Sequence, residues 1–175
     1  MCTITVYRHD HREFEEGEKM ESPGDHRDRL PPDHKDAEDA VRGAQREGEL
    51  IRSRSLYTYD SLEMSEADCR LKAGRHLYQL EVGEADIIHR GDLMIFAEVI
   101  KAIRVEADTE TSAKRYWIPV VGPGRYIEIL VRKATVRRRL KHANEHRSPM
   151  QRATEKIRDS SENREFYETI FKETS

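Results

Sequence analysis

The sequence predicts an α+β protein, a single domain with a mixed, mostly antiparallel split sheet, flanking helices and a C-terminal helical tail. Runs of β-branched and aromatic residues alternate with helix-like segments in the first part of the chain. The last such runs follow one another across short turns, which is typical of antiparallel neighbours. We therefore expect the α+β domain over residues 1–141 and a charged helical tail over residues 142–175.

Four segments have the residue content of β-strands. Thr3–Arg8 is β-branched and aromatic, and His76–Val82 alternates between apolar and polar residues. Leu50–Asp60 is predicted to be extended as well. The longest signal runs over Arg125–Leu140, and a bend near Arg132 would divide it into two strands.

Two helices are predicted on the basis of capping residues. The first begins with Asp33 as its N-cap and runs to about Glu47. The second begins at Asp60 or Ser61 and ends at Gly74.

A third helix is predicted over Leu93–Val105, where apolar residues recur at helical spacing. The preceding tripeptide, Arg90-Gly91-Asp92, resembles an adhesion motif. Its place before a helix favours a turn and an N-cap instead. Phe14–Leu30 and Ala107–Gly124 are predicted to be loops, and Tyr116–Val121 in the second is either an ordered loop or the start of a strand.

Composition limits the classes of protein to consider. Charged residues make up 37% of the chain, and two cysteines are too few for a disulfide framework. No long apolar run is present, so we expect a cytoplasmic protein without a membrane segment. The motifs of nucleotide-binding loops, zinc proteases and serine hydrolases are missing, and we expect no metal site.

Charge is uneven, although the net charge is only −3. The basic strip, Arg132–Lys141, contains six basic residues and no acidic residue. One interpretation is a solvated strand edge protected by charge. Another is a surface that attracts an anion or a nucleic acid, but the acidic balance of the chain does not favour nucleic acid.

Three extended segments each place an unusual side chain beside apolar neighbours. Arg8 and His9 lie on the first strand, Ser55 to Tyr59 precede a helix, and Glu128 stands alone in an apolar run. A buried carboxylate is costly unless it is paired or lies in a wet cleft. The alternatives are that Glu128 points to solvent, that the tyrosines only pack, and that Arg8 forms a surface ion pair.

These segments, taken in order, resemble the ADP-ribosyltransferase superfamily, and in particular the small rifamycin-modifying type. The strand–helix junction Tyr57-Thr58-Tyr59-Asp60 is similar to a junction in that type, and Glu128-Ile129-Leu130-Val131 resembles the catalytic strand of larger members. The resemblance covers Val6–Leu140 in patches. The Ser-Thr-Ser triplet of some members is missing, and Tyr126 occupies the position of the first acid in their Glu-x-Glu pair.

The resemblance implies a domain that binds NAD between two sheets and transfers ADP-ribose to an acceptor. Glu128, Tyr57 and Arg8 are then the candidate catalytic residues. The candidate NAD-binding residues are Arg8, His9, Ser55, Tyr57, Thr58 and Tyr59.

In that family, Glu128 would stabilise the ribose cation and a tyrosine would stack on nicotinamide. Arg8 or His9 would hold a phosphate or ribose, and strand alternation places them on opposite faces. The alternative is a non-catalytic module that binds or inhibits a partner protein through the C-terminal helix or the basic strip. For the transferase, the acceptor is a macromolecule or small molecule that the sequence does not identify.

Overall fold

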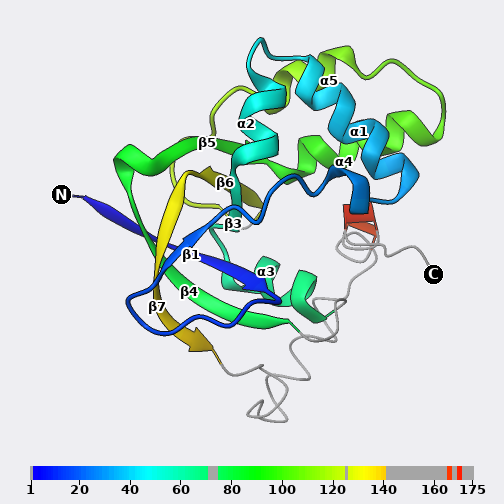
Figure 1. Cartoon of the computed structure of the whole chain (residues 1–175). Helices are drawn as coiled ribbons and strands as arrows, with labels where there is room; N and C mark the ends of the chain where they lie inside the picture. The colour runs from blue at the N-terminus through cyan, green and yellow to red at the C-terminus, as the bar shows by residue number, and fades with distance from the viewer. Residues whose placement is uncertain (1, 71–74, 125, 141–164, 167–168, 171–175) are drawn as a thin grey trace.

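Seven strands form one sheet within the described residues of the computed structural model, which are 2–70, 75–124, 126–140, 165–166 and 169–170. The strand order is β2-β7-β4-β1-β3-β6-β5, and every neighbouring pair is antiparallel (Figure 1). The strands are Thr3–Asp10 (β1), Lys19–Glu21 (β2), Leu56–Tyr59 (β3), His76–Gly83 (β4), Ile87–Asp92 (β5), Ile127–Val131 (β6) and Lys133–Leu140 (β7). The predicted α+β class is confirmed, with an antiparallel rather than a mixed sheet.

The joint between β1 and β3 is the weakest in the sheet. A single residue pair, Tyr7 with Tyr59, joins these strands. By contrast, β1 and β4 share eight pairs, and β3 and β6 share four. The sheet therefore divides into two halves, which we call the β1 half (β2, β7, β4 and β1) and the β3 half (β3, β6 and β5).

The helices cover the sheet unevenly. α1 (Pro32–Gly43), α2 (Gly48–Arg54), α4 (Leu93–Arg104) and α5 (Glu110–Tyr116) group together beside the β3 half (Figure 1). α3 (Leu62–Arg70) instead contacts β1, β3 and β4. Two short 3₁₀ turns, η1 (Arg27–Arg29) and η2 (Glu84–Asp86), lie in connections.

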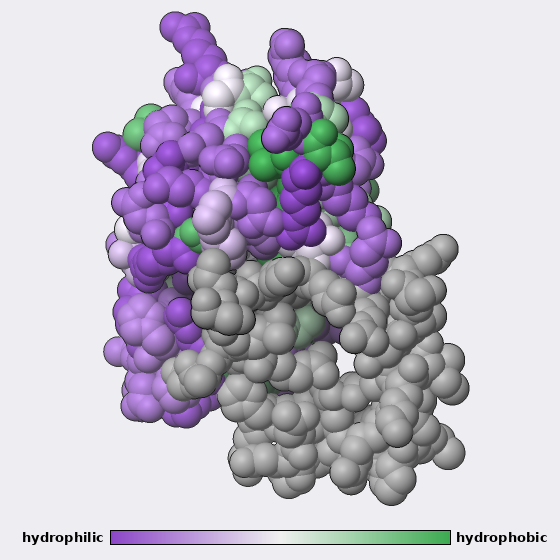
Figure 2. Space-filling view, turned by 90° about the vertical axis from the view of Figure 1, so that its right-hand side faces the viewer, coloured by the Kyte–Doolittle hydropathy of each residue, from purple (hydrophilic) through white to green (hydrophobic). Residues whose placement is uncertain are grey.

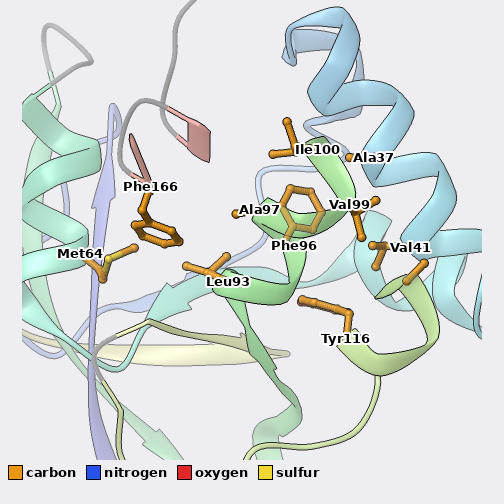
Figure 3. Packing of buried hydrophobic residues seen from close by; sticks show 11 residues of the cluster. Ala37, Val41, Met64, Leu93, Phe96, Ala97, Val99, Ile100, Tyr116 and Phe166 are labelled. Carbon is orange, nitrogen blue, oxygen red and sulfur yellow. The ribbon is translucent and has the colours of Figure 1, made fainter. Parts of the chain in front are cut away.

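Two apolar clusters form the core. The first lies among the helices, where Phe96, Leu93 and Tyr116 meet side chains of α1 and α3 (Figure 3). The second lies between the strands and includes Val6, Tyr78 and Ile129. Burial of apolar surface is the main favourable term in folding. The first cluster therefore stabilises the packing of the helices, and the second stabilises the sheet.

Leu50–Asp60 was predicted to be extended throughout, and this is wrong for its first part. Residues 48–54 form α2, and only Leu56–Tyr59 is a strand. The helix places Arg52 under α1, where it pairs with Glu38. This tertiary ion pair was not visible in the local residue pattern.

Four smaller differences concern the ends of α1 and the predicted loops. Pro31, rather than Asp33, is the N-cap of α1, and that helix ends at Gly43 instead of near Glu47. The predicted loop over Phe14–Leu30 contains the short strand β2. The predicted loop over Ala107–Gly124 contains α5, whose residues Ala113 and Tyr116 are buried.

Other predictions are confirmed. α4 spans Leu93–Arg104, and the Asp92 carboxylate accepts a hydrogen bond from the Met94 amide at 2.8 Å, as an N-cap does. The Ser61 hydroxyl accepts a bond from the Met64 amide at 3.3 Å near the start of α3. The bend near Arg132 separates β6 from β7.

Most of the predicted tail lies outside the described residues, as does the predicted helix end at Gly74. Within the tail, Phe166 is buried in the helical cluster (Figure 3). The centre of its ring lies 4.6 Å from the centre of the Tyr126 ring. Lys101 on α4 also pairs with Glu165. In the part of the chain that the structure describes, no helix is long and apolar enough to span a membrane.

Candidate functional site

The structure brings Tyr57, Tyr59 and Glu128 onto one face of the β3 half. Tyr59 lies directly opposite Glu128 in the β3–β6 ladder. Directly paired residues share a face of an antiparallel sheet, as do residues two apart in one strand. The face bearing these side chains is the one covered by α1 and α2. The Tyr57 hydroxyl donates to the Arg52 carbonyl oxygen of α2 at 2.8 Å and lies 3.4 Å from Glu38 Oε1 of α1.

Glu128 is buried rather than turned to solvent. The Tyr116 hydroxyl donates to Glu128 Oε1 at 2.5 Å, and Arg52 Nη1 donates to the same oxygen at 3.2 Å. Among the described residues, none donates a hydrogen bond to Glu128 Oε2. Burial raises the pKa of Glu128 above its ordinary value, while Arg52 and the Tyr116 hydroxyl act in the opposite direction.

Arg52 is the centre of this network. Its Nε and Nη2 donate to the two carboxylate oxygens of Glu38, each at 2.8 Å, and its side chain is 2% exposed. Its guanidinium carbon also lies 4.9 Å from the ring centre of Tyr116 and 5.1 Å from that of Tyr57. A two-bond pairing of arginine with a carboxylate fixes orientation as well as charge, so Arg52 has one defined position beside Glu128.

Glu38 is shared between two cations. Its Oε1 also accepts a hydrogen bond from Arg42 Nε at 2.8 Å. Burial would raise the pKa of Glu38, but Arg52 and Arg42 outweigh burial and lower it to about 2. Glu38 is therefore ionised at neutral pH.

Gly91 makes room for Tyr116. A Cβ atom at Gly91 would lie 2.5 Å from the Cε2 and Cζ atoms of the Tyr116 ring. Gly91 is paired with Glu128 across the β5–β6 ladder, so the missing side chain lets the tyrosine reach the carboxylate. In the Arg90-Gly91-Asp92 tripeptide, Arg90 pairs with Asp60 and Asp92 caps α4, so each residue has a structural role.

Arg8 lies at the joint between the two halves. Its Nη1 donates to the carbonyl oxygen of Tyr57 at 2.6 Å, and its Nε and Nη2 donate to Asp10, each at 3.2 Å. Its side chain is 15% exposed. Arg8 thus contacts the backbone of the predicted aromatic residue, and it is separate from the Glu38–Arg52–Glu128 network.

The remaining predicted binding residues are buried. The hydroxyl of Ser55 donates to the carbonyl oxygen of Ile51 at 2.7 Å, and that of Thr58 donates to the carbonyl oxygen of Ile129 at 2.8 Å. Both side chains therefore stabilise the backbone around β3. His9 is two residues after Tyr7, and Tyr7 is paired with Tyr59. The side chain of His9 therefore lies on the same face of the sheet as Tyr59.

Sequence reasoning missed Glu38, Arg42, Arg52 and Tyr116. The spacing of Glu38 and Arg42, four residues apart on a predicted helix, was the one available signal for an ion pair. Arg52 and Tyr116 lie in segments that were predicted to be extended or loop. Their contacts with Glu128 join parts of the chain 76 and 12 residues apart.

The basic strip is exposed on β7, and several of its residues pair with β4. Arg137 pairs with Glu81, and Arg138 Nε donates to Gln79 Oε1 at 2.7 Å. The strip is therefore at least partly neutralised or hydrogen-bonded by the neighbouring strand. Within the described residues, no group of three or more histidine, cysteine or acidic side chains is arranged to hold a metal ion.

Comparison of the chain with protein-family models, curated proteins and solved structures gave no match. The arrangement of the site is therefore the basis for the functional argument.

Proposed function

We propose that this protein is an NAD-dependent ADP-ribosyltransferase with Glu128 as its catalytic carboxylate. The observation that carries the proposal is the pattern of hydrogen bonds to the Glu128 carboxylate on β6. One oxygen, Oε1, is fixed by Tyr116 and Arg52, whereas Oε2 receives no hydrogen bond from the described residues. A carboxylate that is held through one oxygen can use the other to accept a hydrogen bond from a hydroxyl group and so orient it.

The proposed reaction replaces the bond between nicotinamide and ribose. Nicotinamide leaves with the electron pair of that bond, and positive charge develops on the ribose ring, as in glycoside cleavage. A fixed carboxylate stabilises this charge and accepts a hydrogen bond from the ribose 2′-hydroxyl. The acceptor then forms the new bond to the same carbon and loses a proton.

Arg52 and Tyr116 hold Glu128 in position for this role through their hydrogen bonds to Oε1. Burial alone favours a neutral carboxyl group, and both neighbours favour the ionised form that the reaction needs. They are positioning residues, because they contact Glu128 instead of the substrate.

Aromatic and cationic side chains are the candidate partners of NAD. Tyr57 and Tyr59 lie on the face of Glu128 and are the candidates to stack on nicotinamide. Arg8 holds the Tyr57 backbone and keeps some exposure, but strand alternation places its side chain on the face opposite Glu128. His9 lies on the face that carries Tyr59 and Glu128, so it is the better candidate to hold a ribose or a phosphate. The low cysteine content is consistent with a cytosolic enzyme.

The test is nicotinamide release from NAD, with the protein alone and with a cell lysate as a source of acceptor. Glu128→Gln should lower the rate by about a hundredfold or more. Glu81→Gln is the matched control, because Glu81 lies on β4 and pairs with Arg137 at the surface. Release by the unaltered protein that Glu128→Gln abolishes and Glu81→Gln preserves would support the proposal.

Absence of both release and NAD binding would reject the enzyme and favour the non-catalytic module.

For such a module, the exposed side chains indicate which surface would contact a partner. The large apolar side chains that are exposed in the described residues are few, and the side of the molecule in Figure 2 is mainly hydrophilic. Phe166 is buried, so in this conformation the basic strip is the better candidate for contacting a partner.

A further inference from the structure

A second feature of the site is a short connecting segment that contacts Arg42 and Tyr57. The strap, residues 22–31, connects β2 to α1. Asp25 in the strap binds Arg42 on α1 with two hydrogen bonds, from Nη2 to Oδ1 at 2.7 Å and from Nη1 to Oδ2 at 2.8 Å. The strap is thus tied to the helix that also carries Glu38.

Arg42 has the features of an anion-binding residue. Its side chain is 2% exposed, and Glu38 holds its Nε from behind. The outer edge of the guanidinium group is occupied by Asp25, whose own side chain is 41% exposed, and Nη1 also donates to Glu49 Oε1 at 3.1 Å. The two-pronged edge of arginine binds phosphate in the same geometry as carboxylate. Asp25 therefore occupies a position that a phosphate group can fill.

The next residue of the strap covers the neighbouring aromatic ring. The His26 ring lies 4.4 Å from the Tyr57 ring, with an angle of 71° between the two planes. Burial lowers the pKa of His26 to about 4, so this ring is neutral at pH 7. Two consecutive residues thus place a carboxylate on a buried arginine and a flat ring on Tyr57.

We propose that Asp25 and His26 form an internal plug of the nucleotide site, in which Asp25 takes the place of a ligand diphosphate on Arg42 and His26 takes the place of a ligand ring on Tyr57. The proposal rests on the proposed function for the identity of the ligand, a dinucleotide with a diphosphate near a ring. Binding of that ligand requires displacement of the plug.

The surroundings of the plug allow a local movement. Gly24 precedes it with a φ of +102°, a conformation that other residues rarely adopt, and nothing lies within 4 Å of the position of a Cβ atom there. Arg27 follows it and is tied to Asp39 on α1. The displacement therefore concerns Asp25 and His26, while the strap stays attached beyond them.

The test measures binding of inorganic pyrophosphate and of ADP-ribose by calorimetry at fixed ionic strength. Asp25→Asn removes the carboxylate that binds Arg42 through two hydrogen bonds, while the more exposed Glu49 stays in place. The affinity for pyrophosphate should rise by roughly tenfold or more, which corresponds to the loss of one charge-assisted contact. Asp28→Asn is the matched control. Asp28 lies in the same strap but is 88% exposed and does not contact Arg42, so its variant should change affinity less than about twofold.

Equal affinities of Asp25→Asn, Asp28→Asn and the unaltered protein for pyrophosphate would overturn the proposal. A second measurement uses the unaltered protein. The Arg27 amide donates to Asp25 Oδ1 at 3.0 Å, so saturation with ADP-ribose should speed hydrogen exchange at this amide. Unchanged exchange there would also overturn the plug.

These outcomes are separate from those of the enzyme test. Tighter pyrophosphate binding by Asp25→Asn supports the plug even if Glu128→Gln has no effect on nicotinamide release. Glu128-dependent release without any effect of Asp25→Asn supports the enzyme and rejects the plug.

Discussion

Opposite charges meet in both halves of the sheet, but in different surroundings. On the β1 half, Arg137 and Glu81 pair across β7 and β4 with side chains 55% and 30% exposed. Over the β3 half, Arg52 and Glu38 pair with side chains 2% and 1% exposed. Exposed pairs contribute little to stability, whereas breaking a buried pair leaves a charge without a partner. The difference suggests that the buried pair is kept for the orientation it gives to Glu128.

The largest expected effect comes from removing the buried cation. Arg52→Met should lower the free energy of unfolding by about 3–5 kcal/mol at neutral pH, because Glu38 and Glu128 lose their shared partner. Chemical denaturation measures this change. Arg54→Met, at an exposed position on the same helix, is the control and should remain close to the unaltered protein.

The effect of Arg52→Met should also depend on pH. In the unaltered protein, the lowered pKa of Glu38 gives stability above about pH 4.5 that is lost as the pH falls toward 2. Without Arg52, the buried carboxyl groups titrate at higher pH, and stability falls as they ionise. The difference between variant and parent should therefore shrink toward pH 4, and a constant difference would contradict the charge argument.

A smaller effect is expected from the glycine that accommodates Tyr116. Gly91→Ala introduces a Cβ atom 2.5 Å from the tyrosine ring, and overpacking of this kind costs about 1–3 kcal/mol. Gly83→Ala is a matched change near the end of β4, where the nearest atom is 3.8 Å away. Denaturation of both variants should show a loss for Gly91→Ala alone. Equal stabilities would mean that Tyr116 moves without cost.

The smallest effect is expected at the exposed pair. Arg137→Gln should change the free energy of unfolding by less than about 1 kcal/mol, and addition of salt should reduce even that change. Denaturation at low and at high ionic strength makes the comparison. A loss as large as that of Arg52→Met would show that the two halves do not differ in the way described.

The sequence predicted the elements whose residues carry a local signal. The apolar spacing of α4, the alternation of β4 and the bend between β6 and β7 are properties of neighbouring residues, and all three are found. Glu128 was noticed because a carboxylate in an apolar run is unusual. Its burial could not be derived, since the partners that make it possible come from α2 and α5.

The same reasoning explains what was missed. Residues 48–54 lie next to a strand and contain at most two residues that favour β-structure. The helix that they form is stabilised by contacts of Arg52 with α1 and with the sheet. Asp25 and His26 belong to a loop whose contacts with Arg42 and Tyr57 are tertiary. No local pattern predicts such contacts.

The two halves that meet at the single β1–β3 residue pair are not consecutive in the sequence. The chain passes back and forth between the halves. It forms β1 and β2 in one half, β3 in the other, β4 in the first, β5 and β6 in the other, and β7 in the first. A cut at any one loop therefore leaves at least one fragment that contains an incomplete half, and neither half can be expressed as a contiguous piece. The threading of the chain therefore prevents the two halves from separating into independent folding units.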